Sequence, residues 1–553
     1  MRTVDENKLL ASLLFRDVKE SVEEILKRYP KRKLNEEQLV LRFAPSPTGF
    51  VHIGSIYAAL INEKLVRQSN GLFLFRAEDT DKEREIENGI EVLVEGIKGF
   101  DIKIDEGALS FEKEIGEYGP YIQSKRVEIY RVFAKDLVSK GLAYPCFSTT
   151  EELNAIRELQ TEKGLRTGYY GEWAKWRDAS LDEIKKQLDD GKPFAIRLYS
   201  KGNIENKINS KDLIKGGVTL SENDMDSVLL KSDGLPTYHF AHPIDDTLMD
   251  ISFVLRGDEW LPSQPLHMEI FSALGFKQLQ YGHISPLMKL ENGGKRKLSK
   301  RKDPEADVAY YVKEGYPIGA VKEYLLNIAN SNFYDWRIQN PKEDVKEFEL
   351  KLEKFNKAGA LFDMTKLNDV CKEYVSKLSS EELYGMTLSW AKKYSKEIEE
   401  KLVNHRDYTV NILNIEREGS KIRKDIAKYS DVLSLLEIFF DDMYEKTEKE
   451  SLEMSKELQK EILEDFLDVF YPGDAIDEWF GKIKNIATKR GFSTDYKEYE
   501  KDPKKFNGKV GDVAMVLRVA ITGKQQAPDL YQIIQVMGES RVRERVKGYI
   551  NSL

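Results

Sequence analysis

Cysteine is scarce in this chain, and long hydrophobic runs are absent from it. Only two cysteines, Cys146 and Cys371, occur in 553 residues, and they lie far apart in sequence. This usage argues against a disulfide framework and suits a reducing compartment. No window approaches the roughly eighteen uninterrupted apolar residues of a membrane-spanning helix. The N-terminus also lacks a basic, apolar and cleavable pattern, so we expect a cytoplasmic protein that is neither secreted nor inserted in a membrane.

An excess of positive charge is missing as well. The formal net charge is −9 at pH 7, which gives no global attraction to nucleic acid. It does not exclude such binding, because only the surface that touches phosphates must be basic. With 41% hydrophobic and 33% charged residues, a chain of this length is expected to form roughly three to five structural units.

The densest motif covers residues 41–54, which read LRFAPSPTGFVHIG. The apolar run at its start predicts a strand, its prolines and glycines predict a stiff loop, and the periodicity from Ile53 to Leu65 predicts a helix. Such a loop lets the backbone approach a phosphate at the positive end of the helix. His52, where the helix begins, can donate to a phosphate oxygen that gains charge during reaction. Taken alone, a short HxG pattern more often belongs to an ordinary surface loop.

Three further segments place charged residues after apolar or glycine-rich stretches. Residues 72–81, LFLFRAEDTD, read as a second buried strand whose first carboxylate is Glu78, and open α/β sheets hold their ligands at strand ends. Residues 253–260 read FVLRGDEW and contain Arg256. Residues 293–304 read GGKRKLSKRKDP, where converging cations could stabilise developing negative charge. A basic run by itself is usually a solvated loop or a nonspecific RNA contact.

Together these segments resemble the signatures of class I aminoacyl-tRNA synthetases. PSPTG before HIG resembles the glutamyl and glutaminyl branch, with Ser55 at a position that is often histidine. Residues 297–301, KLSKR, resemble the KMSKS loop that closes on ATP. The tail from Gly508 resembles the anticodon-binding helices of the glutamyl enzymes of bacterial type, whereas the glutaminyl counterpart is a β-barrel. The resemblance therefore implies a glutamyl-tRNA synthetase of bacterial type.

The resemblance also implies two sets of site residues. The expected ATP-binding set is Pro47, Thr48, Gly49, His52, Gly54, Trp260, Lys297, Leu298, Ser299 and Lys300. The expected glutamate-binding set is Arg42, Ala44, Ser46, Glu78, Tyr238, His242 and Arg256. His52, Lys297 and Lys300 are expected to be catalytic, because they would stabilise the charge of the transition state. No metal-ligating residue is implied.

The choice of amino acid is expected to depend on Arg256. Glutamate and glutamine differ by one charge, and a guanidinium pairs with a carboxylate but matches an amide poorly. The glutaminyl enzymes have no arginine at this place, so Arg256 favours glutamate. Arg42 is a second cation, and which arginine takes which carboxylate is left open. Glu78 is expected at the α-amino group. His242 stands where relatives have asparagine, and an unbonded surface histidine is the alternative.

The implied reaction has two steps at one site. The α-carboxylate of glutamate attacks the α-phosphorus of Mg-ATP, which yields glutamyl-adenylate and pyrophosphate. A ribose hydroxyl of the terminal adenosine of tRNA(Glu), the 2′-hydroxyl by analogy with class I, then takes the acyl group. Positioning and electrostatics carry most of this chemistry, and no covalent nucleophile is needed. Alternatives are an enzyme that also charges tRNA(Gln), a glutaminyl-tRNA synthetase and an inactive tRNA-binding paralogue.

The expected fold is a split Rossmann-like α/β catalytic domain with a mixed α/β insertion, followed by an all-α anticodon-binding region. The expected regions are an N-terminal helical extension (1–37), the first Rossmann half (38–117), an insertion that binds the acceptor end (118–238), the second Rossmann half (239–300), a stem-contact region (301–375) and the helical anticodon-binding region (376–553). The extension either packs on the back of the catalytic domain or serves as a partner-binding arm.

Two sets of basic and aromatic residues are candidates for contact with tRNA, with ordinary packing or surface helix as the alternative. They are Arg166, Tyr169, Tyr170, Trp173 and Arg197 in the insertion, and Arg518, Arg541, Arg543 and Arg545 in the tail. Some relatives bind zinc in the insertion through a Cys-x-Cys start. Here Ser148 follows Cys146 at that spacing, so no structural zinc is expected. A monomer is the default expectation.

Overall fold

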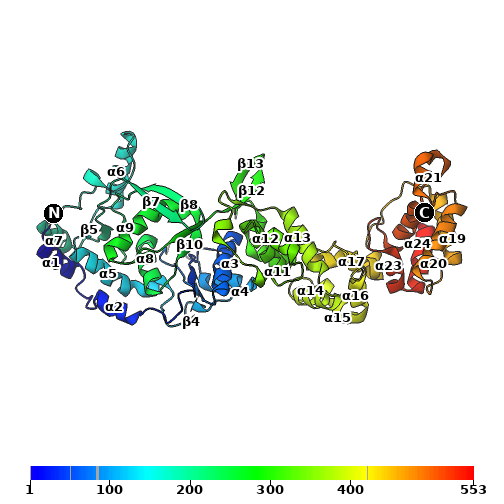
Figure 1. Ribbon diagram of the computed structural model, residues 1–553, viewed down its shortest axis with the longest axis horizontal. Coiled ribbons are helices and arrows are strands. Elements are labelled where there is room, and N and C mark those ends of the chain that lie inside the picture. The colour runs from blue at the N-terminus through cyan, green and yellow to red at the C-terminus, as the bar shows by residue number, and fades with distance from the viewer. Residues whose placement is uncertain (1, 50, 82–85, 300, 420) are drawn as a thin grey trace. The chain divides into compact units, whose positions relative to one another are not determined.

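The computed structural model describes residues 2–49, 51–81, 86–299, 301–419 and 421–553 (Figure 1). The chain forms two compact units, each with its own core. The first consists of Met1–Tyr310 with Lys322–Asp363, and the second of Tyr311–Val321 with Met364–Leu553. The first unit is mixed α/β, and the described part of the second is helical. The predicted fold class, an α/β catalytic part followed by an all-α part, is confirmed.

A mainly parallel sheet forms the centre of the first unit. Strands β1 (Val40–Phe43), β2 (Leu72–Phe75) and β3 (Glu106–Ala108) are parallel, and β4 (Glu114–Ile115) is an antiparallel edge. β10 (Val254–Gly257) and β11 (Tyr281–Ile284) form a second parallel pair. This pair lies beside β1, because the Ser252 N–H donates to Val40 O over 2.9 Å. The central strands β1 and β2 are almost wholly buried, which explains why their sequences, VLRF and LFLF, are almost continuously apolar.

Helices cover this sheet and connect its strands (Figure 1). The helices between the strands of the two halves are α3 (Ile53–Gln68), α4 (Gly89–Gly99), α8 (Tyr238–Leu248), α9 (Gln264–Leu274) and the 3₁₀-helix η3 (Asp258–Ser263). The predicted strand, loop and helix around residues 41–54 are therefore β1, the loop that follows it and α3. Gly71, after α3, lies so close to β1 that a Cβ there would be 1.9 Å from Leu39 O. Only glycine permits that approach.

The first residues of the chain pack on the rest of the first unit. Helices α1 (Val4–Leu14) and α2 (Val22–Arg28) both begin with capping boxes and contact α5 (Val127–Ser139). Beyond them, Arg32 donates to both oxygens of Glu106 over 2.7 and 2.8 Å, and its guanidinium lies 3.8 Å from the ring centre of Tyr118. The Arg32 side chain is only 4% exposed. The extension is thus anchored to β3 by a buried ion pair.

The inserted segment between the two halves of the sheet is mixed α and β. Its three-stranded antiparallel sheet consists of β5 (Ala143–Cys146), β6 (Ala195–Leu198) and β9 (Val228–Leu230), and β7 (Lys207–Asp212) with β8 (Gly216–Ser221) forms a hairpin. Besides α5, its helices are η1 (Gln123–Arg126), α6 (Thr150–Glu162), η2 (Gly171–Trp173) and α7 (Leu181–Asp189). The hairpin reaches β11, where the Leu213 N–H donates to Tyr281 O over 2.8 Å.

A small hairpin follows β11. It consists of β12 (Leu287–Glu291) and β13 (Gly294–Lys297), and β12 also pairs with β14 (Ala360–Leu361). Asn292 and Gly293 form its turn with φ values of 50° and 79°, the conformation of a tight two-residue hairpin loop. The elements that follow are η4 (Pro304–Ala306), α10 (Val308–Glu314), α11 (Ile318–Ala329), α12 (Phe333–Gln339), η5 (Val345–Glu347) and η6 (Leu352–Lys354).

The second unit has no strand among its described residues. From Met364 onward its elements are α13 (Met364–Ser376), α14 (Ser380–Tyr394), α15 (Lys396–Asn404), α16 (Arg406–Asn414), η7 (Tyr429–Asp431), α17 (Val432–Phe439), α18 (Asp441–Tyr444), α19 (Lys456–Val469), α20 (Ile476–Lys489), α21 (Tyr496–Lys501), η8 (Pro503–Lys505), α22 (Val510–Thr522), α23 (Leu530–Met537) and α24 (Glu539–Ser552). Their apolar faces share one core. Across the described parts of the chain, no helix is long and apolar enough to cross a membrane.

Four arginines proposed as tRNA contacts make bonds inside the second unit. Arg518 donates to Pro528 O over 2.8 Å, Arg541 pairs with Asp441 over 2.9 Å, and Arg543 donates to Leu467 O over 2.9 Å. Arg545 is only 6% exposed and donates to Ile521 O over 3.0 Å. These side chains brace the helical unit, and Arg545 is not a surface residue.

The Arg32–Glu106 ion pair generates a stability prediction. We expect Arg32→Met to lower the free energy of unfolding of the first unit by roughly 3–5 kcal/mol, because it leaves the Glu106 carboxylate largely buried without its cation. Arg28→Met in α2 is the matched control, since Arg28 pairs with Glu20 and half of its side chain is exposed. It should cost at most about 1 kcal/mol. Chemical denaturation of the full chain measures both, and equal losses would contradict the assignment.

Candidate active site

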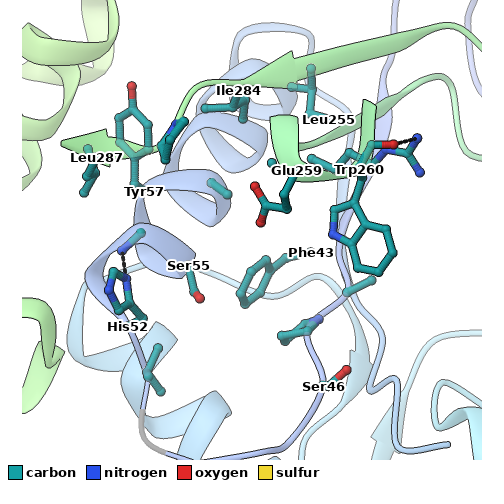
Figure 2. A pocket seen from close by; sticks show the side chains of 18 of the residues that line it. Phe43, Ser46, His52, Ser55, Tyr57, Leu255, Glu259, Trp260, Ile284 and Leu287 are labelled. Carbon is teal, nitrogen blue, oxygen red and sulfur yellow. Dashed lines mark hydrogen bonds between the residues drawn. The ribbon is translucent and has the colours of Figure 1, made fainter. Parts of the chain in front are cut away.

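A cavity of about 660 Å³ opens where the parallel strands of the first unit end. Its walls come from the loop after β1, the first turns of α3, Glu78 beyond the end of β2, the start of α8, the segment after β10 and the β12–β13 hairpin. Figure 2 shows His52 and Ser55 on one side of the cavity and Trp260 on the other. Ligands of open α/β sheets bind at this edge, so the cavity lies where the fold itself predicts a site.

His52 is held by the start of α3. It is the N-cap residue, and its ring Nδ1 accepts the Gly54 N–H over 2.8 Å. Because Nδ1 is an acceptor, a neutral ring carries its proton on Nε2, which is then a donor. Gly54 is needed for this arrangement, since a Cβ at that position would lie 2.9 Å from His52 Nδ1. The helix cap thus determines both the tautomer and the orientation of the histidine.

Of the predicted site residues in the loop after β1, Ala44, Ser46, Thr48 and Gly49 line the cavity. Gly49 has φ of 134°, a conformation that favours glycine. Pro47, which the sequence places in the same set, does not line the cavity. Its carbonyl accepts the Ile86 N–H over 3.2 Å, and a Cβ on Gly89 would meet its ring at 2.8 Å. Pro47 therefore packs against the start of α4.

Arg42 and Glu78 line the opposite part of the cavity and belong to a buried charge network. Arg42 donates through Nε to Asp246 over 3.1 Å and through Nη1 to Leu255 O over 3.2 Å. Its Nη2 donates to no residue that the structure describes. Arg76 joins Asp246 to Glu78, over 2.6 and 3.2 Å. Burial raises the pKa of Glu78 to about 7, against the lowering influence of Arg76 and Arg42.

Arg256 also lines the cavity, but most of its N–H groups are engaged. Nε donates to His283 over 3.1 Å, Nη1 donates to Tyr238 Oη over 3.3 Å and lies 3.0 Å from His267 Nδ1, and Nη2 donates to Trp260 O over 3.1 Å. This leaves a single N–H group, on Nη2. None of these partners is charged, and no described carboxylate pairs with this guanidinium. Among the described residues, its positive charge therefore has no ion-pair partner.

His242 lies behind the cavity wall and is fully buried. Its ring stacks against Tyr238, with centroids 5.6 Å apart and planes 10° apart. Its Nε2 is 3.0 Å from Tyr281 Oη and its Nδ1 is 2.8 Å from Asp246. Burial lowers the pKa of His242 to about 4, so the ring is neutral at physiological pH. The surface alternative is excluded, and His242 reaches the cavity only through Tyr238.

The basic segment after β13 forms the remaining wall. Lys297, Leu298 and Ser299 line the cavity, whereas Lys300 lies outside the described residues. Lys297 keeps 61% of its side chain exposed, and its Nζ is 3.9 Å from Glu259. Asp303 anchors this segment: it accepts two bonds from Arg296, over 2.6 and 2.8 Å, and one from the Ser299 N–H over 2.9 Å.

Several residues that shape the site were missed by sequence reasoning. They are Arg76, Asp245, Asp246, Asp303, His267 and His283. A signal for Arg76 existed, because a charged residue directly after four apolar ones in a buried strand needs a partner. The adjacent aspartates inside the apolar helix α8 carried the same signal. The partnerships themselves join residues up to about two hundred positions apart, which no local pattern reveals.

Four of the five candidate tRNA contacts of the insertion form two pairs. Tyr169 and Arg197 are buried together, with the guanidinium 4.1 Å from the ring centre, and they support packing. Arg166 and Tyr170 form a more exposed pair, 4.7 Å apart. Cys146 donates its Sγ–H to Tyr169 Oη over 3.5 Å. Within the described ranges, no group of three or more histidine, cysteine, aspartate or glutamate side chains is placed to hold a metal ion.

Comparison with known proteins gives two family matches. A model described as the catalytic domain of class I tRNA synthetases (E and Q) matches residues 38–369. A model of an anticodon binding domain matches residues 382–550. The segment matched by the first model includes every residue that lines the cavity.

Relatives match over almost the whole chain. A glutamate–tRNA ligase of Clostridium perfringens (strain SM101 / Type A) is 46% identical over 545 residues, which are 98% of this chain and 99% of the relative. One from Sorangium cellulosum (strain So ce56) is 43% identical over 571 residues, 97% and 100% of the two chains. A crystal structure of a glutamate tRNA ligase from Elizabethkingia meningosepticum, in complex with its amino acid, matches with a TM-score of 0.73 and 26% identity, over 93% of this chain and 100% of that one.

Proposed function

The chain belongs to the class I tRNA synthetases for glutamate and glutamine, and from this premise we propose that it is a cytoplasmic glutamate–tRNA ligase. It activates L-glutamate with Mg-ATP and transfers the glutamyl group to tRNA(Glu). The proposal is carried by near full-length similarity to glutamate–tRNA ligases together with Arg256, a cation in the cavity wall that has no ion-pair partner among the described residues. A monomer remains the default, and the six regions of the chain remain a prediction.

The amino acid is held by the wall that contains Arg42, Glu78, Tyr238 and Arg256. Tyr238 accepts a bond from Arg256, so its own O–H can be donated to the same ligand oxygens as the remaining N–H of Arg256. A carboxylate fits these donors and the unbalanced charge, whereas the amide of glutamine would supply no charge. The side-chain carboxylate of glutamate therefore faces Arg256, and Glu78 pairs with the α-ammonium group.

Arg42 has a different environment from Arg256. Asp246 already neutralises Arg42, but its Nη2 faces no described partner. It can therefore orient the α-carboxylate through hydrogen bonds without a strong ion pair. That oxygen must stay nucleophilic, because it attacks the α-phosphorus of ATP. The assignment leaves Arg256 for the carboxylate that takes no part in the reaction.

The phosphates lie on the other side of the cavity, near the loop after β1 and the start of α3. The His52 Nε2–H and the Lys297 ammonium stabilise the charge that develops as the α-carboxylate attacks and pyrophosphate leaves. Lys300 has the same role by the motif alone, since it lies outside the described residues. A ribose hydroxyl of the terminal adenosine then attacks the acyl carbon of the adenylate, and AMP leaves. The helical unit, matched by an anticodon binding domain, holds the far end of the tRNA.

Pyrophosphate exchange with each amino acid tests the proposed function. With ATP and tRNA(Glu) present, glutamate should support exchange at least roughly 100-fold better than glutamine in kcat/KM, because the charge of Arg256 is left unpaired by an amide. Charging of purified tRNA(Glu) and tRNA(Gln) then shows whether the second tRNA is also a substrate. Equal exchange with glutamine would indicate a glutaminyl enzyme. Exchange with neither amino acid would indicate an inactive tRNA-binding paralogue.

Gly54 provides a test of the phosphate side. We expect Gly54→Ala to lower kcat for exchange by up to roughly 100-fold, because the added Cβ would displace the His52 ring from its bond to the backbone. Gly99→Ala is the matched control: it lies at the end of α4, and a Cβ there meets no atom within 4 Å. The control should keep wild-type activity. Wild-type activity of the Gly54→Ala variant would show that catalysis does not depend on the orientation of the His52 ring.

Glu78 provides a test of the amino-acid side through pH. Burial raises its pKa to about 7, and only the ionised carboxylate can pair with an ammonium group. The KM for glutamate should therefore rise as the pH is lowered from 8 to 6, while kcat changes less. Glu78→Gln should raise KM at all pH values and flatten this dependence. An unchanged pH dependence in the variant would show that another group titrates.

A further inference from the structure

Arg256 rests in a cradle of histidines that the proposed mechanism does not use. His267, on α9, places Nδ1 3.0 Å from Arg256 Nη1, and its Nε2 is 2.9 Å from His239 Nδ1. His283, on β11, stands directly opposite Arg256 in the register of the two parallel strands and accepts from its Nε over 3.1 Å. Both rings are fully buried. The chain contains only six histidines, so their concentration here calls for an explanation.

The bonds determine the proton positions in these rings. A guanidinium can only donate, so His283 Nε2 and His267 Nδ1 must both be acceptors. Each ring is therefore neutral and carries its proton on the other nitrogen. His283 donates through Nδ1 to Asp212, 2.6 Å away, and His267 donates through Nε2 to His239. Burial lowers the pKa of both rings, that of His267 well below its usual range, which agrees with neutral imidazoles.

Asp212 fixes the tautomer of His283 from the end of the β7–β8 hairpin. It is only 2% exposed, and its second oxygen accepts the N–H groups of Ile214 and Lys215 over 2.8 and 2.7 Å. These bonds leave it no freedom to turn. If Asp212 could not accept from Nδ1, the His283 proton would move to Nε2 and face the N–H of Arg256.

We propose that His267 and His283 are positioning residues that select glutamate over glutamine, by orienting Arg256 through acceptors that leave its charge uncompensated. Asp212 maintains the acceptor state of His283. This inference rests on the proposed function, because it assigns Arg256 to the side-chain carboxylate of the substrate.

The physical advantage lies in the neutrality of the cradle. A carboxylate in place of either imidazole would orient Arg256 equally well but would form an ion pair with it, as Asp246 does with Arg42. The substrate carboxylate would then have to compete with a permanent partner. Neutral acceptors satisfy the buried N–H groups, which would otherwise be costly, and keep the positive charge for the ligand. That charge is what separates glutamate from glutamine.

Asparagine and glutamine substitutions test this in a crossed design. An asparagine amide overlays the Nδ1 position of a histidine ring, and a glutamine amide overlays the Nε2 position. At position 283, Arg256 uses Nε2, so His283→Gln should retain selectivity and His283→Asn should not. At position 267, Arg256 uses Nδ1, so His267→Asn should retain selectivity and His267→Gln should not. Glutamine should therefore be the better substitute at position 283, and asparagine the better substitute at position 267.

The readout is the ratio of kcat/KM for glutamate to that for glutamine in pyrophosphate exchange with tRNA(Glu). The two unfavourable variants should lose roughly 10- to 100-fold of this ratio, mainly through a higher KM for glutamate, because a hydrogen bond to a charged group is lost. The two favourable variants should stay within a few-fold of the wild type. Thermal unfolding shows whether all four variants are folded at the assay temperature. A variant that unfolds early is compared with the wild type at a lower temperature.

Two further variants complete the experiment. Asp212→Asn is isosteric but should lower the ratio as His283→Asn does, because it forces the other tautomer. Lys277→Gln, on the surface after α9, is the control and should change nothing. Wild-type exchange that does not depend on glutamate would overturn the proposed function. The other outcome is that wild-type exchange depends on glutamate, but the asparagine and glutamine variants rank in the same order at both positions or none has an effect. That outcome would overturn the positioning role of the histidines and leave the proposed function intact.

Discussion

The catalytic unit depends on two adjacent carboxylates buried in α8. Asp245 accepts from Arg126 over 2.7 Å, and Asp246 accepts from Arg76 over 2.6 Å and from Arg42 over 3.1 Å. Burial by itself would raise the pKa of Asp246, but Arg42 and Arg76 hold it well below its usual range. The three arginines come from β1, from the end of β2 and from the start of the insertion. One pair of carboxylates on α8 therefore joins the separate halves of the sheet.

Such a network is strongly interdependent. Buried ions are expensive, and removing one partner leaves another charge without compensation. Its members also reach the cavity, because Arg42 and Glu78 belong both to the network and to the lining. The interactions that hold the two halves of the sheet together thus also place the groups that face the amino acid. Arg256 is not part of this network, and its hydrogen-bond partners among the described residues are all neutral. Among the described residues that line the amino-acid side of the cavity, it is the one cation without an ion-pair partner.

The phosphate side is built by different means. Here the backbone decides the geometry: His52 is oriented by the first turn of α3, and Gly49 and Gly54 supply a conformation and a space that other residues lack. The basic segment is organised by Asp303, which binds Lys289 and Arg296 and leaves Lys297 turned to the cavity. Basic residues that look equivalent in the sequence therefore divide into structural and exposed ones.

The sequence alone determined the fold class, and most of the site residues named from it line the cavity. Apolar strands, turn residues and helical periodicity are local properties, and the resemblance of short segments to the synthetase signatures named His52, Glu78, Tyr238 and Arg256 without coordinates. These residues do meet in one cavity. Local pattern also predicted a helical tail, and the same resemblance gave its likeness to anticodon-binding helices.

Tertiary structure decided what local pattern cannot contain. It turned Pro47 and His242 away from the cavity, gave the tail arginines partners inside the helical unit and distributed the charges. Whether an arginine is neutralised, like Arg42, or left unbalanced, like Arg256, depends on residues brought together from distant parts of the chain. Electrostatic interactions and burial act through space, so the state of a charged group is a property of the folded chain and not of its neighbours in sequence.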